Sequence, residues 1–429
     1  MAIETDPTVN NLVAELLDHD RLLSQALEHE DDTRPSQKVQ AMVTKLLSRA
    51  EMLSNPKALE ADGLIKAGTW SLDSVREKED VRAEAKRTGV SVHFGQLMTI
   101  ASIKFYELAQ HLQKMKGRID YRGDCAKDEH GAAAVYQELR ANPTSVQGLN
   151  ACLAYGLLPG HSSSAAGAVK AYVQALLSSK YRTWIELPPE LRPKHWRDKF
   201  VKPVVLLVKA LYGHPDAGGL WEQHLKKIIK NLGGQEVPEY PGNFFFPDTK
   251  LLLSTYVDDL TLARPTEEHE PFWAKLTSVA DIEPPEPIYR ILGRNHLVMP
   301  LSKTEGSEEC AAFRAQEALV FDMLDYAHQT VDLYKSITNT KSLKHAATPF
   351  VPDGSVTIDD EEAKGELAPN ACCILMKALW LGRLSRPDII KPINDLATKV
   401  QSWSGGRQEV VKAYPIHRLN TTVPTCRYH

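Results

Sequence analysis

The sequence lacks the short motifs that mark common classes of metalloprotein, secreted protein and membrane protein. Its six cysteines form no C-x-x-C pair, and its 15 histidines form no H-E-x-x-H motif or Cys/His knuckle, so neither a zinc signature nor a disulfide framework is present. No apolar run is long enough to cross a bilayer, and the polar residues 1–10 do not resemble a signal peptide. We therefore expect a protein of the cytoplasm or nucleus that has no membrane partner.

A strong excess of charge is also missing. The 51 lysine and arginine residues nearly balance the 55 aspartate and glutamate residues, and the net charge is -4. Such a chain has no overall attraction for nucleic acid, so contact with a phosphate backbone must come from local basic segments. Hydrophobic residues make up 43% of the 429 residues, a length and composition that suit a globular protein of two or three domains.

The first part of the chain has helical periodicity. Leucine and valine recur at helical spacing over residues 12–27 and again over residues 39–50, with a polar, proline-containing segment between them. The pattern predicts a helical N-terminal extension over residues 1–55, whose apolar stripes serve packing rather than cofactor binding. A helical adaptor that uses these stripes to bind another protein is an alternative.

The most informative stretch is residues 251–263, where two apolar runs flank Asp258 and Asp259. Such runs predict two short strands joined by a tight turn, with both carboxylates at the tip. Carboxylates held close together by rigid strands suit a divalent cation such as Mg²⁺. Aspartate is also common in ordinary turns, and the pairs Asp31-Asp32 and Asp359-Asp360 lie in polar segments. The apolar flanks distinguish Asp258 and Asp259 from these pairs.

The segment Tyr256-Val257-Asp258-Asp259 resembles the YVDD box of copia-type retrotransposon reverse transcriptases. Further segments resemble motifs of the same family in the same order along the chain. They are residues 66–72 (KAGTWSL), 114–124 (KMKGRIDYRGD), 168–189, 202–213 (ending KALYG), 289–294 (YRILGR), 347–350 (ATPF) and 379–389 (ending SRPDI). The resemblance covers about residues 56–404 and concerns only the polymerase module of the Pol polyprotein.

The resemblance implies an α+β right-hand polymerase fold, with fingers, a palm built on an antiparallel sheet, and a helical thumb. Fingers and palm would occupy about residues 56–300, and the thumb and connection about residues 301–404. We expect residues 405–429 to form an irregular tail. The implied activity is RNA-directed DNA polymerisation, a nucleotidyl transfer that uses Mg²⁺ or Mn²⁺, deoxynucleoside triphosphates, an RNA template and a DNA primer.

The resemblance also assigns roles to individual residues. Asp258 and Asp259 would be the catalytic metal ligands, and Tyr256 would lie beside the primer end. Lys116 and Arg118 would bind the nucleotide, because alternating basic side chains can clamp a triphosphate. Without the resemblance, the same lysine and arginine would suit a solvated edge strand.

Two departures from the family pattern indicate impaired activity. Gly167 stands where the family has the first metal-binding aspartate of the palm, and a two-metal site needs carboxylates from two strands. In the loop over residues 214–219, residues 215–219 stand where the family has Lys-Gln-Ala-Pro-Arg, and Asp216 would place a negative charge near the triphosphate. The chain also lacks a recognisable ribonuclease H. The alternative is therefore a non-catalytic domesticated protein or genomic relic that at most binds nucleic acid.

Several local patterns predict structure rather than chemistry. Helical periodicity predicts helices over residues 221–232, 267–280, 316–326 and 331–338. The segment Arg386-Pro387-Asp388 predicts a structural turn held by an arginine–aspartate pair.

Overall fold

The computed structural model describes residues 56–104, 114–137, 139–300, 317–341, 343, 365, 367–404 and 426–428. The chain divides into two compact units, which we describe separately. Unit 1 comprises Met1–Arg140 and Tyr172–Trp221, and unit 2 comprises Ala141–Ala171 and Glu222–His429. The expected helical extension over residues 1–55 lies outside the described residues.

Unit 1 is built on a mixed sheet that collects strands from distant parts of the sequence. Its strand order is β1 (Trp70–Glu77), β7 (Pro203–Leu207), β6 (Arg182–Glu186), β2 (Val92–Lys104) and β3 (Lys114–Tyr121), with β4 (Lys127–Asp128) also paired to β2. Strands β2 and β6 run parallel to each other. Helices α3 (Pro56–Lys66) and α4 (Lys78–Thr88) also belong to this unit, and the short α6 (Ala171–Gln174) starts at its boundary. Ile185 and Val205, both fully buried, lie in the main apolar core.

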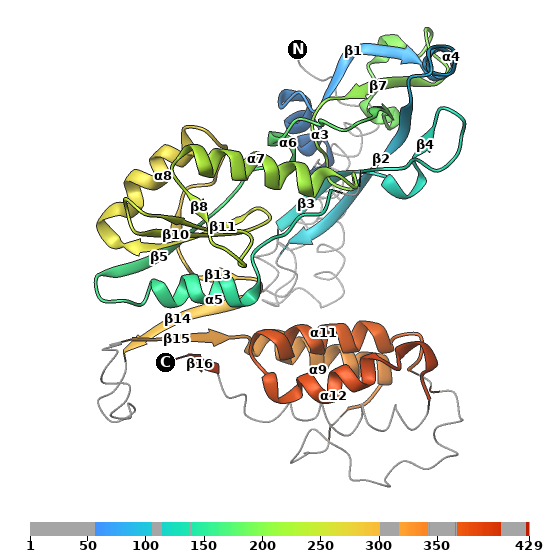
Figure 1. Ribbon diagram of the computed structural model, residues 1–429. Coiled ribbons are helices and arrows are strands. Elements are labelled where there is room, and N and C mark those ends of the chain that lie inside the picture. The colour runs from blue at the N-terminus through green and yellow to red at the C-terminus, as the bar shows by residue number, and fades with distance from the viewer. Residues whose placement is uncertain are drawn as a thin grey trace, which may run out of the picture. The chain divides into compact units, whose positions relative to one another are not determined.

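Unit 2 contains an antiparallel six-stranded sheet. Its order is β12 (Glu286–Pro287), β5 (His161–Gly167), β11 (Asp259–Pro265), β10 (Leu251–Tyr256), β9 (Asn243–Phe246) and β8 (Gln235–Glu236). Helix α5 (Val146–Tyr155) covers one face, where the Cys152 thiol lies 3.5 Å from the Leu252 carbonyl oxygen. Helix α8 (His269–Thr277) covers the other face, where Trp273 donates a hydrogen bond to Ser164 over 2.8 Å (Figure 1). Helix α7 (Ala217–Asn231) begins at the unit boundary.

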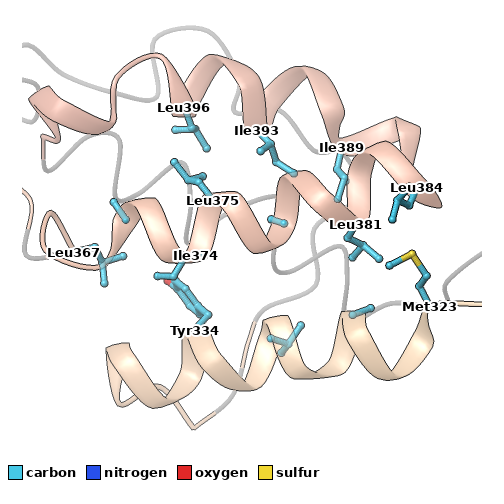
Figure 2. Packing of buried hydrophobic residues seen from close by; sticks show 14 of the residues in the cluster. Met323, Tyr334, Leu367, Ile374, Leu375, Leu381, Leu384, Ile389, Ile393 and Leu396 are labelled. Carbon is cyan, nitrogen blue, oxygen red and sulfur yellow. The ribbon is translucent and has the colours of Figure 1, made fainter. Parts of the chain in front are cut away.

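A second sheet and a helical cluster complete unit 2. Strands β13 (Arg290–Ile291), β14 (Arg294–Pro300), β15 (Glu317–Asp322) and β16 (Cys426–Tyr428) form an antiparallel sheet. Helices α9 (Leu324–Thr338), α11 (Ala371–Leu384) and α12 (Ile390–Ala397) pack their apolar side chains together, as Figure 2 shows. Tyr334, Ile374, Leu381 and Ile393 are all buried there, and each such side chain stabilises the cluster by about 1.5–3 kcal/mol.

Short 3-10 helices connect several of these elements. They are η2 (Gly123–Cys125), η3 (Pro189–Leu191), η4 (Lys194–Trp196), η5 (Thr266–Glu268), η7 (Pro387–Ile389) and η8 (Val400–Ser402). Among the described residues, we find no helix that combines the length and the apolar character needed to cross a membrane.

The α+β class predicted from the sequence is confirmed, and so are the helices expected over residues 221–232 and 267–280, which correspond to α7 and α8. The helix expected over residues 316–326 is wrong in its first half. Residues Glu317–Asp322 form β15, because every residue of this segment pairs with β14 and tertiary strand pairing overrides a local helical pattern. Residues 405–429 were expected to be irregular, but β16 lies within this range and pairs with β15.

The predicted turn at Arg386 is also confirmed. The Arg386 guanidinium donates two hydrogen bonds to the Asp388 carboxylate, at 2.9 and 2.8 Å. Arg386 is only 3% exposed, so this two-pronged pair fixes the connection between α11 and α12.

Candidate functional site

The acidic tip of the β10–β11 hairpin is the candidate site. The two strands pair from Leu252 and Ala263 to Tyr256 and Asp259, so Val257 and Asp258 form a two-residue turn. The inward leucines of the hairpin are fully buried (Leu251, Leu253, Leu260, Leu262), and this burial fixes the register because a one-residue slip would expose them. Asp258 and Asp259 are exposed. The hairpin predicted from the sequence is confirmed.

The turn itself holds Val257 in an unfavourable backbone conformation. Val257 has φ 57°, whereas Asp258 is not among the residues with positive φ. A positive φ at only the first turn position is the pattern of a type II′ turn, which normally has glycine there. A β-branched residue in this region is strained, and such strain concentrates at functional sites.

Gly167 lies directly beside this acidic tip. Strand β5 pairs with β11 so that Gly167 is the cross-strand partner of Asp259, and the Ala168 amide donates a 2.7 Å hydrogen bond to the Asp258 carbonyl oxygen. Opposite residues of antiparallel strands point to the same face, with Cβ atoms about 4.5–5.5 Å apart. A side chain at position 167 would therefore project next to Asp259. Strand β5 has no acidic residue of its own (HSSSAAG).

A carboxylate from another segment occupies the space that Gly167 leaves open. Glu283 Oε2 lies 3.0 Å from the position that a Cβ atom on residue 167 would take. The Glu283 amide donates a 2.8 Å hydrogen bond to the Gly167 carbonyl oxygen, and Ile282 pairs with Ala168. Glu283 is not marked by any sequence pattern, because nothing in the proline-rich connector that follows it indicates a cross-strand position.

These carboxylates do not form a complete metal site. Within the described part of the chain, no three His, Cys, Asp or Glu side chains are arranged to hold one ion. Asp258 and Asp259 offer two carboxylates, and Mg²⁺ is commonly bound by one or two carboxylates together with substrate phosphates and water. The donor set fits one loosely held ion and does not fit a pair of ions bridged by carboxylates from two strands.

The other predicted site residues lie in two different units. Tyr256 ends β10 and is half-buried beside Asp259, its cross-strand partner in unit 2. Lys116 and Arg118 are exposed on β3 of unit 1. The Arg118 guanidinium lies over the Tyr212 ring, 4.8 Å from its centroid. Its Nε atom is 3.9 Å from Asp120 Oδ1, so Arg118 is held in place by neighbours within its own unit.

The loop over residues 214–219 differs from the sequence-based expectation. Asp216 is fully buried, and its carboxylate accepts a 3.3 Å hydrogen bond from the Leu139 amide. The expectation that its charge faces a triphosphate is therefore wrong. The neighbouring His214 packs against Tyr121 and Tyr136, with ring centroids 5.1 Å apart in both pairs, and burial lowers the pKa of His214 to about 4.

The comparison with protein-family models finds no match to this chain. The resemblance to reverse transcriptases therefore depends on the sequence motifs and their order alone.

Proposed function

We propose that this is a retrotransposon-derived, copia-type reverse-transcriptase-like protein whose RNA-directed DNA polymerase activity is impaired at Gly167. The supporting observation is the pairing of Gly167 with Asp259. The resemblance assigns the family's two acidic motifs to segments far apart in the sequence, and these segments are adjacent strands in the fold. In this proposal the β5–β11–β10 sheet is the palm, unit 1 is the fingers, and helices α9, α11 and α12 are the thumb.

The proposal gives the hairpin tip its chemical role. Asp258 and Asp259 would hold Mg²⁺ or Mn²⁺, and the metal would supply charge neutralisation for phosphoryl transfer. The resemblance gives Tyr256 the role of the residue by the primer end, and it gives Lys116 and Arg118 the role of nucleotide contacts. The strained turn at Val257 orients the two carboxylates relative to the rigid sheet.

Because the set of metal ligands is incomplete, we expect low polymerase activity. A bridging carboxylate from β5 is missing, and within the described residues no third ligand is in place. One ion stabilises the transferring phosphate less well than two ions that also stabilise the attacking and leaving oxygens. The same observation favours the second candidate function, a non-catalytic descendant that binds nucleic acid.

Primer extension distinguishes the two functions. The full chain is incubated with an RNA template, a labelled DNA primer and deoxynucleoside triphosphates, in Mg²⁺ or Mn²⁺. We expect slow extension that Asp258→Asn abolishes and that Asp325→Asn, which changes an exposed aspartate of α9, leaves intact. No extension in either metal would identify the non-catalytic descendant. Extension that survives Asp258→Asn would show that the hairpin tip is not the active site.

A further inference from the structure

A serine and a histidine of unit 2 face each other between the six-stranded sheet and helix α8. Side chains alternate along a strand, so Ser162 and Ser164 of β5 share the face that α8 covers. His269 is the first residue of α8, and its Nδ1 atom lies 2.7 Å from Ser164 Oγ. Ser164 and His269 are both half-buried, so the pair remains partly open to solvent. Nucleophilic catalysis needs this separation between a hydroxyl and its general base.

The surroundings of His269 Nε2 fix the tautomer of the ring. This atom lies 3.1 Å from the Ser162 carbonyl oxygen and 3.4 Å from the Arg264 carbonyl oxygen, and Ser162 Oγ, at 3.2 Å, can accept from it as well. Carbonyl oxygens only accept hydrogen bonds, so Nε2 carries the proton. The lone pair on Nδ1 of the neutral ring then accepts the proton of the Ser164 hydroxyl.

The neutral form of His269 is favoured at pH 7. Burial lowers the pKa of His269 from its usual value of 6.5, and the charge of Arg264 lowers it as well. The Arg264 guanidinium itself forms an ion pair with Glu268. A neutral imidazole is the form that can act as a general base.

The Ser164 hydroxyl is held in position by Trp273, one turn further along α8. The indole Nε1 donates a 2.8 Å hydrogen bond to Ser164 Oγ, and Trp273 is buried. A hydroxyl oxygen has two lone pairs. The indole uses one of them and the hydroxyl proton points to His269, so the second lone pair is available to attack an electrophile. The same indole N–H stabilises the negative charge that develops on Oγ when the proton leaves.

The neighbours of Ser164 on its own face of the sheet are apolar. Its cross-strand partners are Leu262 of β11 and Pro287 of β12, and opposite residues of antiparallel strands point to the same face. Pro287 is exposed and lies at the edge of the sheet, in the two-residue strand β12. A molecule that approaches the hydroxyl from this edge meets apolar surface, which favours a short, uncharged acyl group.

We propose that Ser164 and His269 form a nucleophile–base pair that reacts with short, uncharged carboxylic esters. Ser164 Oγ bonds to the acyl carbon as its proton passes to His269 Nδ1, and the bond from that carbon to the ester oxygen breaks. The alcohol leaves with the proton from His269. Water then attacks the acyl-serine, and His269 passes a proton from this water to Ser164 Oγ as the free carboxylic acid is released. The inference goes beyond the proposed polymerase, because it needs neither metal nor nucleotide and concerns other residues.

The expected turnover is slow, because His269 is oriented by carbonyl oxygens rather than by a carboxylate. In the Ser-His-Asp triad the carboxylate stabilises the imidazolium that forms, and a neutral carbonyl oxygen does so less well. Acylation of Ser164 by an activated ester should therefore be faster than hydrolysis of the acyl-serine. The pair predicts a burst of about one alcohol released per chain, followed by a slow steady phase.

The test uses the full chain in EDTA with p-nitrophenyl acetate and, separately, with a fluorophosphonate probe that modifies activated serines. We expect a burst of about one p-nitrophenolate per chain and a modified peptide in which tandem mass spectrometry locates the label on Ser164. The labelling rate of the unmodified chain should rise with pH through an apparent pKa below 6.5, because only the neutral His269 ring accepts the proton. These readouts need no substitution, so they do not depend on the folding of a variant.

Substitutions separate a reactive pair from hydrogen bonds that only hold α8 to the sheet. Ser164→Ala should abolish the burst and the label, and His269→Asn should slow labelling by about 100-fold or more. Ser163→Ala is the matched control and should react as the unmodified chain does. Ser163 is the neighbouring serine on the opposite face of β5, where its hydroxyl lies against Gly156.

Three results would overturn the inference. They are a label on residues other than Ser164, equal labelling rates in His269→Asn and the unmodified chain, and no label at any pH. Urea midpoints of the variants show which of them retain the fold.

Discussion

Placing an aspartate at position 167 tests the geometry of the candidate site without relying on catalysis. In Gly167→Asp the new carboxylate would project beside Asp259 on the same face of the sheet. It would also meet Glu283, whose Oε2 atom lies 3.0 Å from the new Cβ position. That atom is the end of a flexible, exposed side chain, so it can move aside at small steric cost. The main effect is therefore electrostatic.

The size of this electrostatic effect on stability follows from the solvent exposure of the carboxylates around position 167. Two carboxylates about 5 Å apart repel by roughly 1 kcal/mol in a water-like dielectric, and the new aspartate gains at least two such neighbours. Replacing glycine within a strand stabilises the folded state by about 0.5–1 kcal/mol, because the unfolded chain then has less conformational entropy to lose. We expect Gly167→Asp to lower the free energy of unfolding by about 1 kcal/mol in EDTA. Divalent metal should reverse the loss, because an ion that binds only the folded state stabilises it by about 2.7 kcal/mol at a hundredfold excess over its dissociation constant.

Urea unfolding in EDTA and in millimolar MgCl₂ measures both effects. Gly167→Asn is the matched control, since it has the same shape without the charge and should show neither the loss nor the response to metal. Adding Glu283→Gln to Gly167→Asp should recover part of the stability lost in EDTA. The reasoning is refuted if Gly167→Asp and Gly167→Asn unfold at the same urea concentration and neither responds to Mg²⁺. Primer extension by the same variants then shows whether the added carboxylate changes the rate of nucleotide incorporation.

Three further predictions concern residues that hold the fold. Val257→Gly should raise the urea midpoint relative to Val257→Ala, because only glycine removes the cost of about 1–2 kcal/mol for a left-handed residue; a lower midpoint for glycine would contradict the strain at this turn. Lowering the pH should destabilise the chain by about 3 kcal/mol through His214. Its pKa of about 4 in the folded chain lies below the pKa of 6.5 of an unfolded histidine. The unfolded chain therefore takes up the proton first, and the stability present above pH 6.5 is lost as the pH falls towards 4. Unfolding at pH 5 and 7.5 should show this loss reduced in His214→Asn but not in His195→Asn. Asp388→Ala should destabilise the helical cluster by about 3 kcal/mol, since it leaves the buried Arg386 guanidinium without its partner, and urea unfolding of Arg386→Met/Asp388→Ala should show part of that loss recovered.

The hairpin and the helices around it were predictable because their signals are local. The apolar runs on either side of Asp258 and Asp259 specify two strands and a turn within a few residues. Helices α7 and α8 have apolar stripes of helical period, and the pair of Arg386 and Asp388 is separated by one residue. Each of these features is decided by neighbours in the sequence.

The features that the sequence did not reveal depend on pairing between distant segments. Strand β5 consists mainly of serine and alanine, which have no strong preference for strands, so only its pairing with β11 defines it. Strand β15 is likewise fixed by β14. The burial of Asp216 depends on Leu139, and the position of Glu283 depends on the end of β5. Neither partner is marked by a local pattern.

The open end of β5 also has an evolutionary consequence. A GGT or GGC codon for glycine becomes an aspartate codon through a single base change, so an acid opposite Asp259 can be as little as one mutation away. A variant with this aspartate would meet the Glu283 side chain in the same space. Selection for metal binding at this tip would then be expected to alter the glutamate soon after the glycine.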